Sequence, residues 1–162
     1  KAKLCNISIV GMPSSGKTTI GKALAEKLGK TFVALEEEIV RRAGKSIPDI
    51  FAQEGEAAFR RLETEAAAEA AKHTGQVISC GGGIVKTPGN ARLLRQNGPV
   101  LWICRPLEAL TVGGGRPLSS SREALEKMEA ERLPLYRAAA DLEVDNLGPE
   151  DTADEIIRRL KL

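Results

Sequence analysis

Aromatic residues are scarce in this sequence of 162 residues, at 3% of the composition, with a single Trp and a single Tyr. Proteins that bind single-stranded nucleic acid usually stack the bases on aromatic side chains, so this class is disfavoured. The sequence holds 24 Lys and Arg against 22 Asp and Glu, a net charge of +2. Such a balance argues against a large footprint on a phosphate backbone. We therefore expect no nucleic-acid partner.

Histidine and cysteine are rare as well. His73 is the only histidine, which leaves little material for a histidine-based zinc site or a Ser–His–Asp triad. Cys5, Cys80 and Cys104 are an odd number and form no C-x-x-C pair. This pattern predicts reduced thiols rather than disulfides or a metal site, and a cytoplasmic localisation.

Long apolar runs are missing too, since none approaches the roughly 18–20 residues that a membrane-spanning helix needs. No leader-like segment opens the sequence, and we expect no membrane partner. The length fits one domain of roughly 100–200 residues, so residues 1–162 are expected to form a single domain and a monomer.

Glycine, in contrast, is frequent and clustered. The 16 glycines gather at Gly11 and Gly16, at Gly81–Gly83 and at Gly113–Gly115. Clusters of this kind indicate places where the backbone comes close to another group.

Patterns typical of strands and helices alternate along the chain. Strands are predicted at residues 4–10, 31–35, 76–80, 100–104 and 142–144, and helices at 17–28, 36–43, 46–51, 56–73, 90–96, 122–140 and 151–160. The alternation predicts an α/β fold in three layers, with a parallel sheet of about five strands flanked by helices. Two glycine clusters directly follow predicted strands, so they lie at the edge where such sheets bind ligands.

The first cluster belongs to the segment Gly11-Met-Pro-Ser-Ser-Gly-Lys-Thr18, which matches G-x-x-x-x-G-K-[ST] between a predicted strand and a predicted helix. In this motif backbone N–H groups surround phosphates, the lysine reaches the β- and γ-phosphates, and the hydroxyl after it ligates Mg²⁺. The predicted nucleotide ligands are Gly11, Ser14, Ser15, Gly16, Lys17, Thr18 and Thr19, with Thr18 as the metal ligand. The short chain and the absence of a guanine-reading Asn/Thr-Lys-x-Asp pattern favour an ATP-dependent small-molecule kinase.

Further motifs follow in a fixed order. They are Gly44-Lys-Ser-Ile47 followed by Ile50-Phe51, Gly55-Glu56, Phe59-Arg-Arg-Leu-Glu63, Gly81–Gly83, Arg116-Pro-Leu118, and Arg132 four residues before Tyr136. With them the sequence resembles the shikimate kinase family, within the nucleoside-monophosphate-kinase-like P-loop proteins, over nearly its whole length.

The resemblance implies a role for each matching residue. Arg60 and Arg132 would hold the carboxylate of the acceptor, with Glu63 orienting Arg60, and Gly81, Gly82 and Gly83 would form the floor beneath the acceptor ring. Lys17 and Arg116 would be catalytic, Arg116 from a short lid at about residues 108–121.

Two departures from the family stand out. The family has Asp-x-Asp after its second strand, and the matching positions here are Ala34 and Glu36. Glu36 keeps a carboxylate, one methylene longer, and is the expected catalytic and substrate-binding acid. The lid segment with Gly113–Gly115 carries no positive charge before Arg116.

The implied activity is ATP- and Mg²⁺-dependent transfer of a phosphoryl group to the hydroxyl of a small carboxylate-bearing metabolite, foremost shikimate, which gives shikimate 3-phosphate in aromatic amino-acid biosynthesis. Two alternatives stay open at this point. One is a kinase for another small hydroxy or amino acid such as homoserine, and the other is a nucleotide-binding relative with little catalysis.

Overall fold

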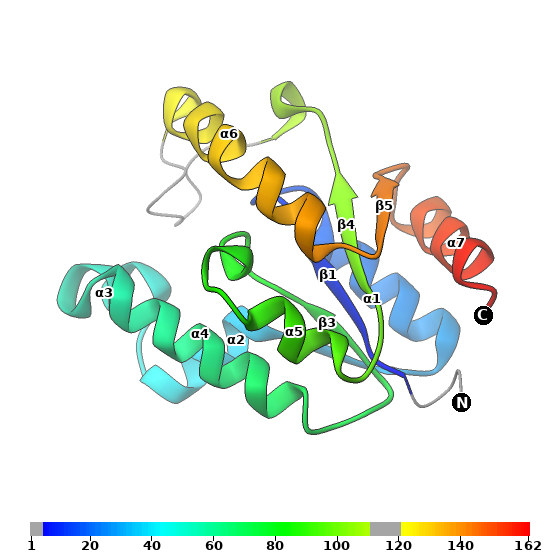
Figure 1. Cartoon of the computed structure of the whole chain (residues 1–162), viewed down its shortest axis with the longest axis horizontal. Coiled ribbons are helices and arrows are strands. Elements are labelled where there is room, and N and C mark those ends of the chain that lie inside the picture. The colour runs from blue at the N-terminus through cyan, green and yellow to red at the C-terminus, as the bar shows by residue number, and fades with distance from the viewer. Residues whose placement is uncertain (1–4, 111–120) are drawn as a thin grey trace.

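A parallel sheet of five strands organises the computed structural model, which describes residues 5–110 and 121–162 (Figure 1). The strands are β1 (Ile7–Val10), β2 (Thr31–Ala34), β3 (Gln76–Ser79), β4 (Val100–Cys104) and β5 (Leu142–Asp145). The α-helices are α1 (Lys17–Leu28), α2 (Leu35–Ala43), α3 (Ile47–Glu54), α4 (Glu56–Ala70), α5 (Asn90–Arg95), α6 (Arg122–Ala139) and α7 (Pro149–Leu160), and η2 (Ile84–Lys86) and η3 (Leu107–Ala109) are short 3₁₀ turns. The predicted α/β fold with a five-stranded parallel sheet is confirmed.

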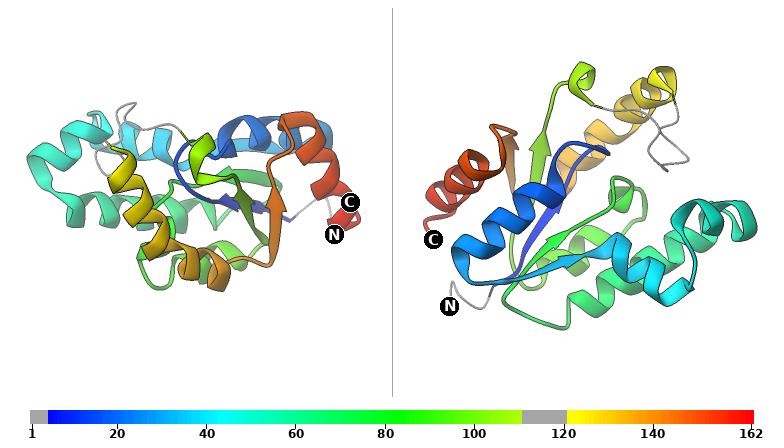
Figure 2. Two further views of the ribbon diagram at one scale, coloured as in Figure 1. Left: turned by 90° about the horizontal axis from the view of Figure 1, so that it is seen from above. Right: turned by 180° about the vertical axis from the view of Figure 1, so that it is seen from behind.

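Helices cover both faces of the sheet (Figure 2). Ile7 and Ile9 of β1 pack with side chains of α1 and α7, whereas Val10 packs with side chains of α2, α4, α5 and α6 on the opposite face. Successive residues of a strand point to opposite faces, so one buried strand contributes to both hydrophobic cores. This is the three-layer arrangement that the alternating pattern predicts.

The strand order is β2-β3-β1-β4-β5, which places β1 at the centre between β3 and β4. From β1 the chain runs first toward β2 and β3 and later to the other side. In open parallel sheets a crevice forms at such a reversal, beyond the carboxyl ends of the strands. The segments that follow β1, β3 and β4 therefore share one edge of the sheet.

Local signals set most element ends. Gly29 ends α1 in a left-handed conformation, and the Ser46 hydroxyl accepts a hydrogen bond from the amide of Asp49 at the start of α3. Several predicted ends are wrong: α3 runs to Glu54 rather than to residue 51, α4 stops at Ala70 rather than at residue 73, and α7 starts at Pro149 rather than at residue 151. Proline is favoured in the first turn of a helix, because its missing N–H has no partner there in any case.

Residues 111–120 lie outside the described part of the chain. Arg116, Gly113–Gly115 and most of the expected lid fall there, so the predictions about them stay predictions. Among the described helices, none combines the length and the apolar character that crossing a membrane requires.

Candidate active site

The loop between β1 and α1 has the backbone of a phosphate cradle. Gly16 has φ of +101°, and a Cβ atom there would lie 2.5 Å from the side-chain nitrogen of Asn146. Ser14 also has positive φ, at 62°, which is uncommon outside glycine. Asn146, just after β5, donates a hydrogen bond to the carbonyl oxygen of Ser15 at 2.7 Å and so fixes the loop from outside.

Polar groups of this loop fit a phosphate ligand with a metal ion. The Lys17 ammonium donates to the carbonyl oxygens of Gly11 and Met12, both at 2.9 Å, and so lies across the loop. The buried hydroxyl of Ser15 has no hydrogen-bond partner among the described residues. Thr18, in the exposed first turn of α1, presents a hydroxyl suited to Mg²⁺. The helix start adds a positive dipole end.

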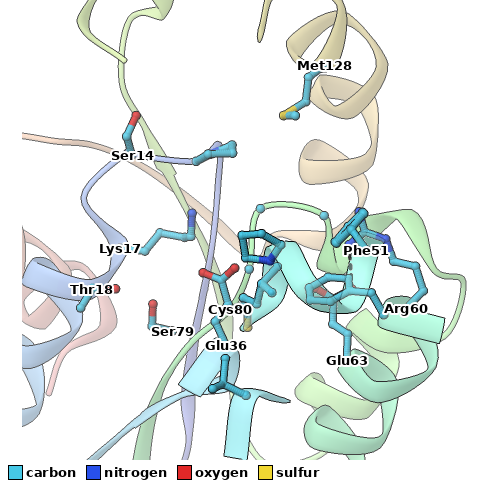
Figure 3. Close-up of a pocket in the computed structure, with 18 of the residues that line it drawn as sticks. Ser14, Lys17, Thr18, Glu36, Phe51, Arg60, Glu63, Ser79, Cys80 and Met128 are labelled. Atoms are coloured by element: carbon cyan, nitrogen blue, oxygen red, sulfur yellow. Dashed lines mark hydrogen bonds and ion pairs between the residues drawn. The ribbon is translucent and has the colours of Figure 1, made fainter. Parts of the chain in front are cut away.

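An open cavity of about 580 Å³ lies beside this loop. It is lined by residues from the loop, from α2, α3, α4 and α6, and from the segment that follows β3 (Figure 3). The predicted site residues in its wall are Ser14, Gly16, Lys17, Thr18, Thr19, Glu36, Arg60, Gly81, Gly82, Gly83 and Arg132. Gly11 and Ser15 belong to the loop but not to this wall. The fold thus brings together residues that are more than 100 positions apart.

Arg60 is held at the cavity by two carboxylates. Its Nε and Nη2 donate to one oxygen of Glu56 at 3.2 and 3.1 Å, and its Nη1 donates to Glu63 at 3.0 Å. The hydrogen bond from Arg60 to Glu63 is consistent with the expected role of Glu63 in orienting Arg60. Glu56 also pairs with Lys86 at 2.7 Å, and this ammonium holds the pKa of Glu56 below its usual range. Burial raises the pKa of Glu63, which Arg60 opposes.

Arg132 of α6 faces the same cavity and is only 3% exposed. Within residues 5–110 and 121–162, no carboxylate lies at ion-pair distance from its guanidinium. A buried cation is costly unless an anion or several acceptors satisfy it. Arg132 therefore brings a buried positive charge to the cavity that no carboxylate of the described residues pairs with.

The three glycines after β3 make room for the side chains of the site itself. A Cβ atom on Gly83 would lie 2.5 Å or less from the terminal nitrogens of Arg60, and one on Gly82 would lie 3.1 Å from Nη1 of Arg132. One on Gly81 would lie 3.1 Å from an oxygen of Glu63. Sequence reasoning expected a floor beneath a ligand and missed this second reason for glycine.

Glu36 is in the first turn of α2, where the helix dipole favours a negative charge. Its side chain is exposed and points into the cavity, on the side of Lys17 (Figure 3). Ala34, the other departure, ends β2 and pairs in register with Ser79 of β3, whose side chain lines the cavity. Sequence reasoning missed Ser79, although its place at the carboxyl end of a strand was a usable signal.

A phosphate loop at the centre of a parallel sheet, next to a cavity lined by two arginines and the carboxylate of Glu36, defines a small-molecule kinase of the P-loop class. Comparison with known proteins identifies its family. The family model for shikimate kinase matches residues 13–161, so the chain belongs to the shikimate kinase family.

Individual relatives agree with this assignment. The chain is 40% identical to a shikimate kinase of Nitrosomonas europaea over 87% of this chain and 70% of the relative. It is 40% identical to one from Symbiobacterium thermophilum over 96% of each. Among solved structures, shikimate kinase from Acinetobacter baumannii in complex with shikimate superimposes with a TM-score of 0.92, at 35% identity, over 98% of this chain and 93% of the other.

Proposed function

We propose that the protein catalyses phosphoryl transfer from ATP to a hydroxyl group of shikimate, giving shikimate 3-phosphate and ADP. The observation that carries this proposal is the pair Arg60 and Arg132, two guanidinium groups turned into one cavity next to a phosphate loop. Two such planar cations bind one carboxylate with strong, charge-assisted hydrogen bonds. The acceptor is therefore an acid as well as an alcohol.

The hydrogen bonds of Arg60 leave it ready for this task. A guanidinium has five N–H groups, and three of those of Arg60 are used by Glu56 and Glu63, which leaves two. Arg132 interacts with the hydroxyl of Tyr136, but no carboxylate of the described residues forms an ion pair with it. An acceptor carboxylate would supply the charge that is missing between the two arginines.

Part of the cavity wall is apolar and suits a carbon ring. It consists of Val40, Ile47, Pro48, Phe51, Phe59 and Met128. A cyclic acid can pack one face against these side chains while its carboxylate reaches the arginines. A linear amino acid such as homoserine would leave this wall uncovered and would place its ammonium near two cations. These features support shikimate over homoserine.

At the donor end, MgATP supplies the phosphoryl group, and the loop residues position it. Lys17 would bind the terminal phosphates, the hydroxyl of Thr18 would ligate Mg²⁺, and Ser15 would gain the partner that its hydroxyl lacks. We propose that the oxygen of the acceptor hydroxyl attacks the γ-phosphorus while the bond from this phosphorus to the leaving ADP breaks. Glu36 takes the proton of that hydroxyl in the same step. Arg116 would stabilise the developing charge.

A steady-state assay with two acceptors tests the proposal. Wild-type protein with MgATP should phosphorylate shikimate at rates of about 1–100 s⁻¹ and leave homoserine unchanged. Arg60→Ala should raise the KM for shikimate at least 10-fold and leave the KM for ATP within twofold. Arg61→Ala is the matched control, because Arg61 is the exposed neighbour on the same helix. Equal losses for both substrates in Arg60→Ala, or turnover of homoserine alone, would contradict the proposal.

Three further expectations are part of the same proposal. We infer that residues 1–162 act as one domain with a lid at about residues 108–121, that the protein is a monomer, and that it works in the cytoplasm.

A further inference from the structure

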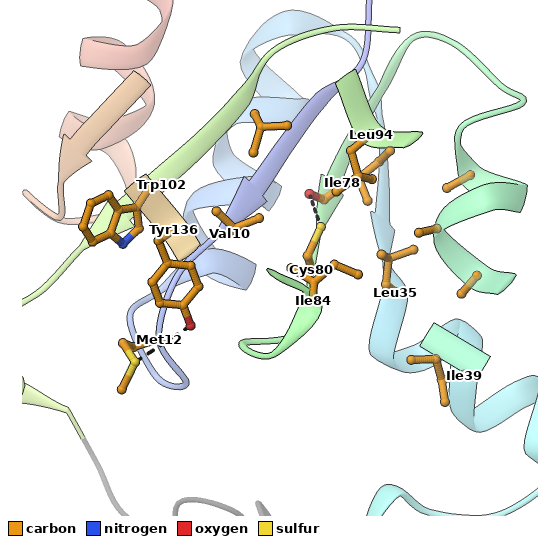
Figure 4. Close-up of a cluster of buried hydrophobic side chains, with 14 of the residues drawn as sticks. Val10, Met12, Leu35, Ile39, Ile78, Cys80, Ile84, Leu94, Trp102 and Tyr136 are labelled. Carbon is orange, nitrogen blue, oxygen red and sulfur yellow. Dashed lines mark hydrogen bonds between the residues drawn. The ribbon is translucent and has the colours of Figure 1, made fainter. Parts of the chain in front are cut away.

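Tyr136 of α6 is completely buried at the junction of the two binding loops. Its hydroxyl donates a hydrogen bond to the carbonyl oxygen of Gly82 at 2.5 Å, and the sulfur of Met12 lies 3.8 Å from the same hydroxyl (Figure 4). Met12 belongs to the phosphate loop and Gly82 to the loop at the acceptor cavity. One side chain therefore touches both loops.

The two loops also contact each other directly at this point. A Cβ atom on Gly82 would lie 2.9 Å from the ring of Pro13 in the phosphate loop, so the backbone of Gly82 packs against that proline. Tyr136 lies behind this contact. Its ring stacks on Trp102 of β4, with centroids 5.7 Å apart, which limits its own movement.

The hydroxyl keeps its proton under all ordinary conditions, because burial raises the pKa of Tyr136 to about 12. It is therefore a permanent donor to the carbonyl of Gly82. Arg132, one helical turn earlier on α6, faces the acceptor cavity and interacts with the same hydroxyl, which partly opposes the rise in its pKa. Helix α6 thus carries both a proposed carboxylate ligand and the group that fastens the acceptor loop.

We propose that Tyr136 is a positioning residue that couples the nucleotide site to the acceptor site, by holding the Gly82 loop against the phosphate loop. An acceptor that orders the Gly82 loop then also orders Met12 and Pro13, so nucleotide binds with less loss of conformational freedom. By linkage, the nucleotide strengthens acceptor binding by the same factor. The inference rests on the proposed function, because it takes shikimate as the acceptor.

Calorimetric titrations measure this coupling without any turnover. The dissociation constant of shikimate is determined with and without saturating MgADP, and that of MgADP with and without shikimate. In the wild-type protein each ligand should tighten the other at least fivefold, by equal factors. In Tyr136→Phe, which keeps the ring and removes the hydroxyl, the factor should fall below twofold. The dissociation constant of each ligand measured alone should change by less than threefold.

Thr64→Val is the matched control. Thr64 is on α4, and its hydroxyl donates a hydrogen bond to the side-chain oxygen of Asn90 at 2.9 Å. This hydroxyl contacts neither the phosphate loop nor the Gly82 loop, so the coupling factor of Thr64→Val should stay at the wild-type value. If Tyr136→Phe does not fold, Met12→Ala cuts the same link from the nucleotide side and should lower the factor as well.

Coupling of wild-type size in a folded Tyr136→Phe or Met12→Ala protein overturns the proposal, and so does a wild-type factor below twofold. A wild-type protein that binds MgADP but not shikimate overturns the proposed function, and this inference with it. A wild-type protein that turns over shikimate without coupling leaves the proposed function intact and removes only the role of Tyr136.

Discussion

Charged side chains of the cavity lie against the three glycines Gly81–Gly83, in space that a Cβ atom on these residues would fill. The guanidinium of Arg60 lies over Gly83, whose backbone has φ of −96° and ψ of 10°, values that any residue adopts without strain. Glycine at position 83 is therefore required for space and not for conformation. A methyl group there would have to displace Arg60, the end of a flexible side chain, rather than backbone.

Gly83→Ala should consequently change the site more than the fold. We expect the KM for shikimate to rise about 10-fold or more, because Arg60 must move away from its two carboxylates. The KM for ATP should stay within twofold, and the free energy of unfolding should fall by less than about 1 kcal/mol. Steady-state kinetics and urea unfolding measure the two effects. A loss of stability without any change in the KM for shikimate would contradict the placement of Arg60.

We expect Glu63 to give acceptor binding a dependence on pH. Because burial raises the pKa of this carboxyl above its usual range, a fall in pH protonates Glu63 earlier than an exposed glutamate. Protonation removes the anion that holds Nη1 of Arg60, so the KM for shikimate should rise as the pH falls through this raised pKa. The effect on folding stability has the opposite direction. Because the pKa of Glu63 is raised in the folded state, its ionised form lowers the free energy of unfolding at higher pH, and a fall in pH removes this loss.

Kinetics between pH 5 and 8 test this prediction with Glu63→Gln as the comparison. The variant should have a high KM for shikimate at every pH and should lose the acidic rise that the wild-type protein shows. The carboxyl of the substrate titrates equally with both proteins, so only the difference between the two profiles counts. Identical profiles would exclude Glu63 as the titrating group.

At the scale of elements, the parts that could be predicted from sequence are those whose signals are local. Lys17–Leu28 is preceded by a phosphate-loop motif and followed by a glycine cap, so the helix and its ligand were both predictable. Arg60 and Arg132 lie 72 positions apart on different helices, and only the resemblance to a family joined them beforehand. The link from Tyr136 to Met12 and Gly82 depends on how α6 packs against two loops, which no periodicity describes.

Helix α6 begins at a capping residue whose contribution can be measured. The hydroxyl of Ser121 accepts a hydrogen bond from the amide of Ala124 at 3.0 Å, as the hydroxyl of Ser46 does for Asp49 at the start of α3. Ser121→Ala should lower the free energy of unfolding by about 1 kcal/mol, because a helical N–H loses its acceptor. Ser46→Ala should cost a similar amount, and Ser121→Asp should restore stability. Urea denaturation decides, and an unchanged midpoint in Ser121→Ala would contradict the cap.

At the scale of the whole molecule, the two ends of the sheet have different tasks. The carboxyl ends of the strands carry the phosphate loop and the acceptor cavity. At the amino ends, Asn6 is buried and joins separate segments. Its side chain donates to the carbonyl oxygen of His73 at 2.8 Å and accepts from the backbone N–H of Gln76 at 3.0 Å. The backbone N–H of Asn6 donates to the carbonyl oxygen of Asn97. Within the part of the chain that the structure describes, no predicted site residue lies at this end, so we expect Asn6 to contribute to stability and not to ligand binding.

A pair of asparagine variants tests this division. Asn6→Ala should lower the free energy of unfolding by about 1–3 kcal/mol, because it leaves the buried backbone amide of Gln76 without its acceptor and removes one of the two donors to the carbonyl of His73. Both KM values should stay within twofold wherever the protein is folded. Asn146→Ala removes the bond to the carbonyl of Ser15 and the group next to Gly16, so the KM for ATP should rise about 10-fold, with a loss of stability below about 1.5 kcal/mol. Since both variants delete the same amide group, a similar effect of both on the KM for ATP would show that the two ends of the sheet are not separate in function.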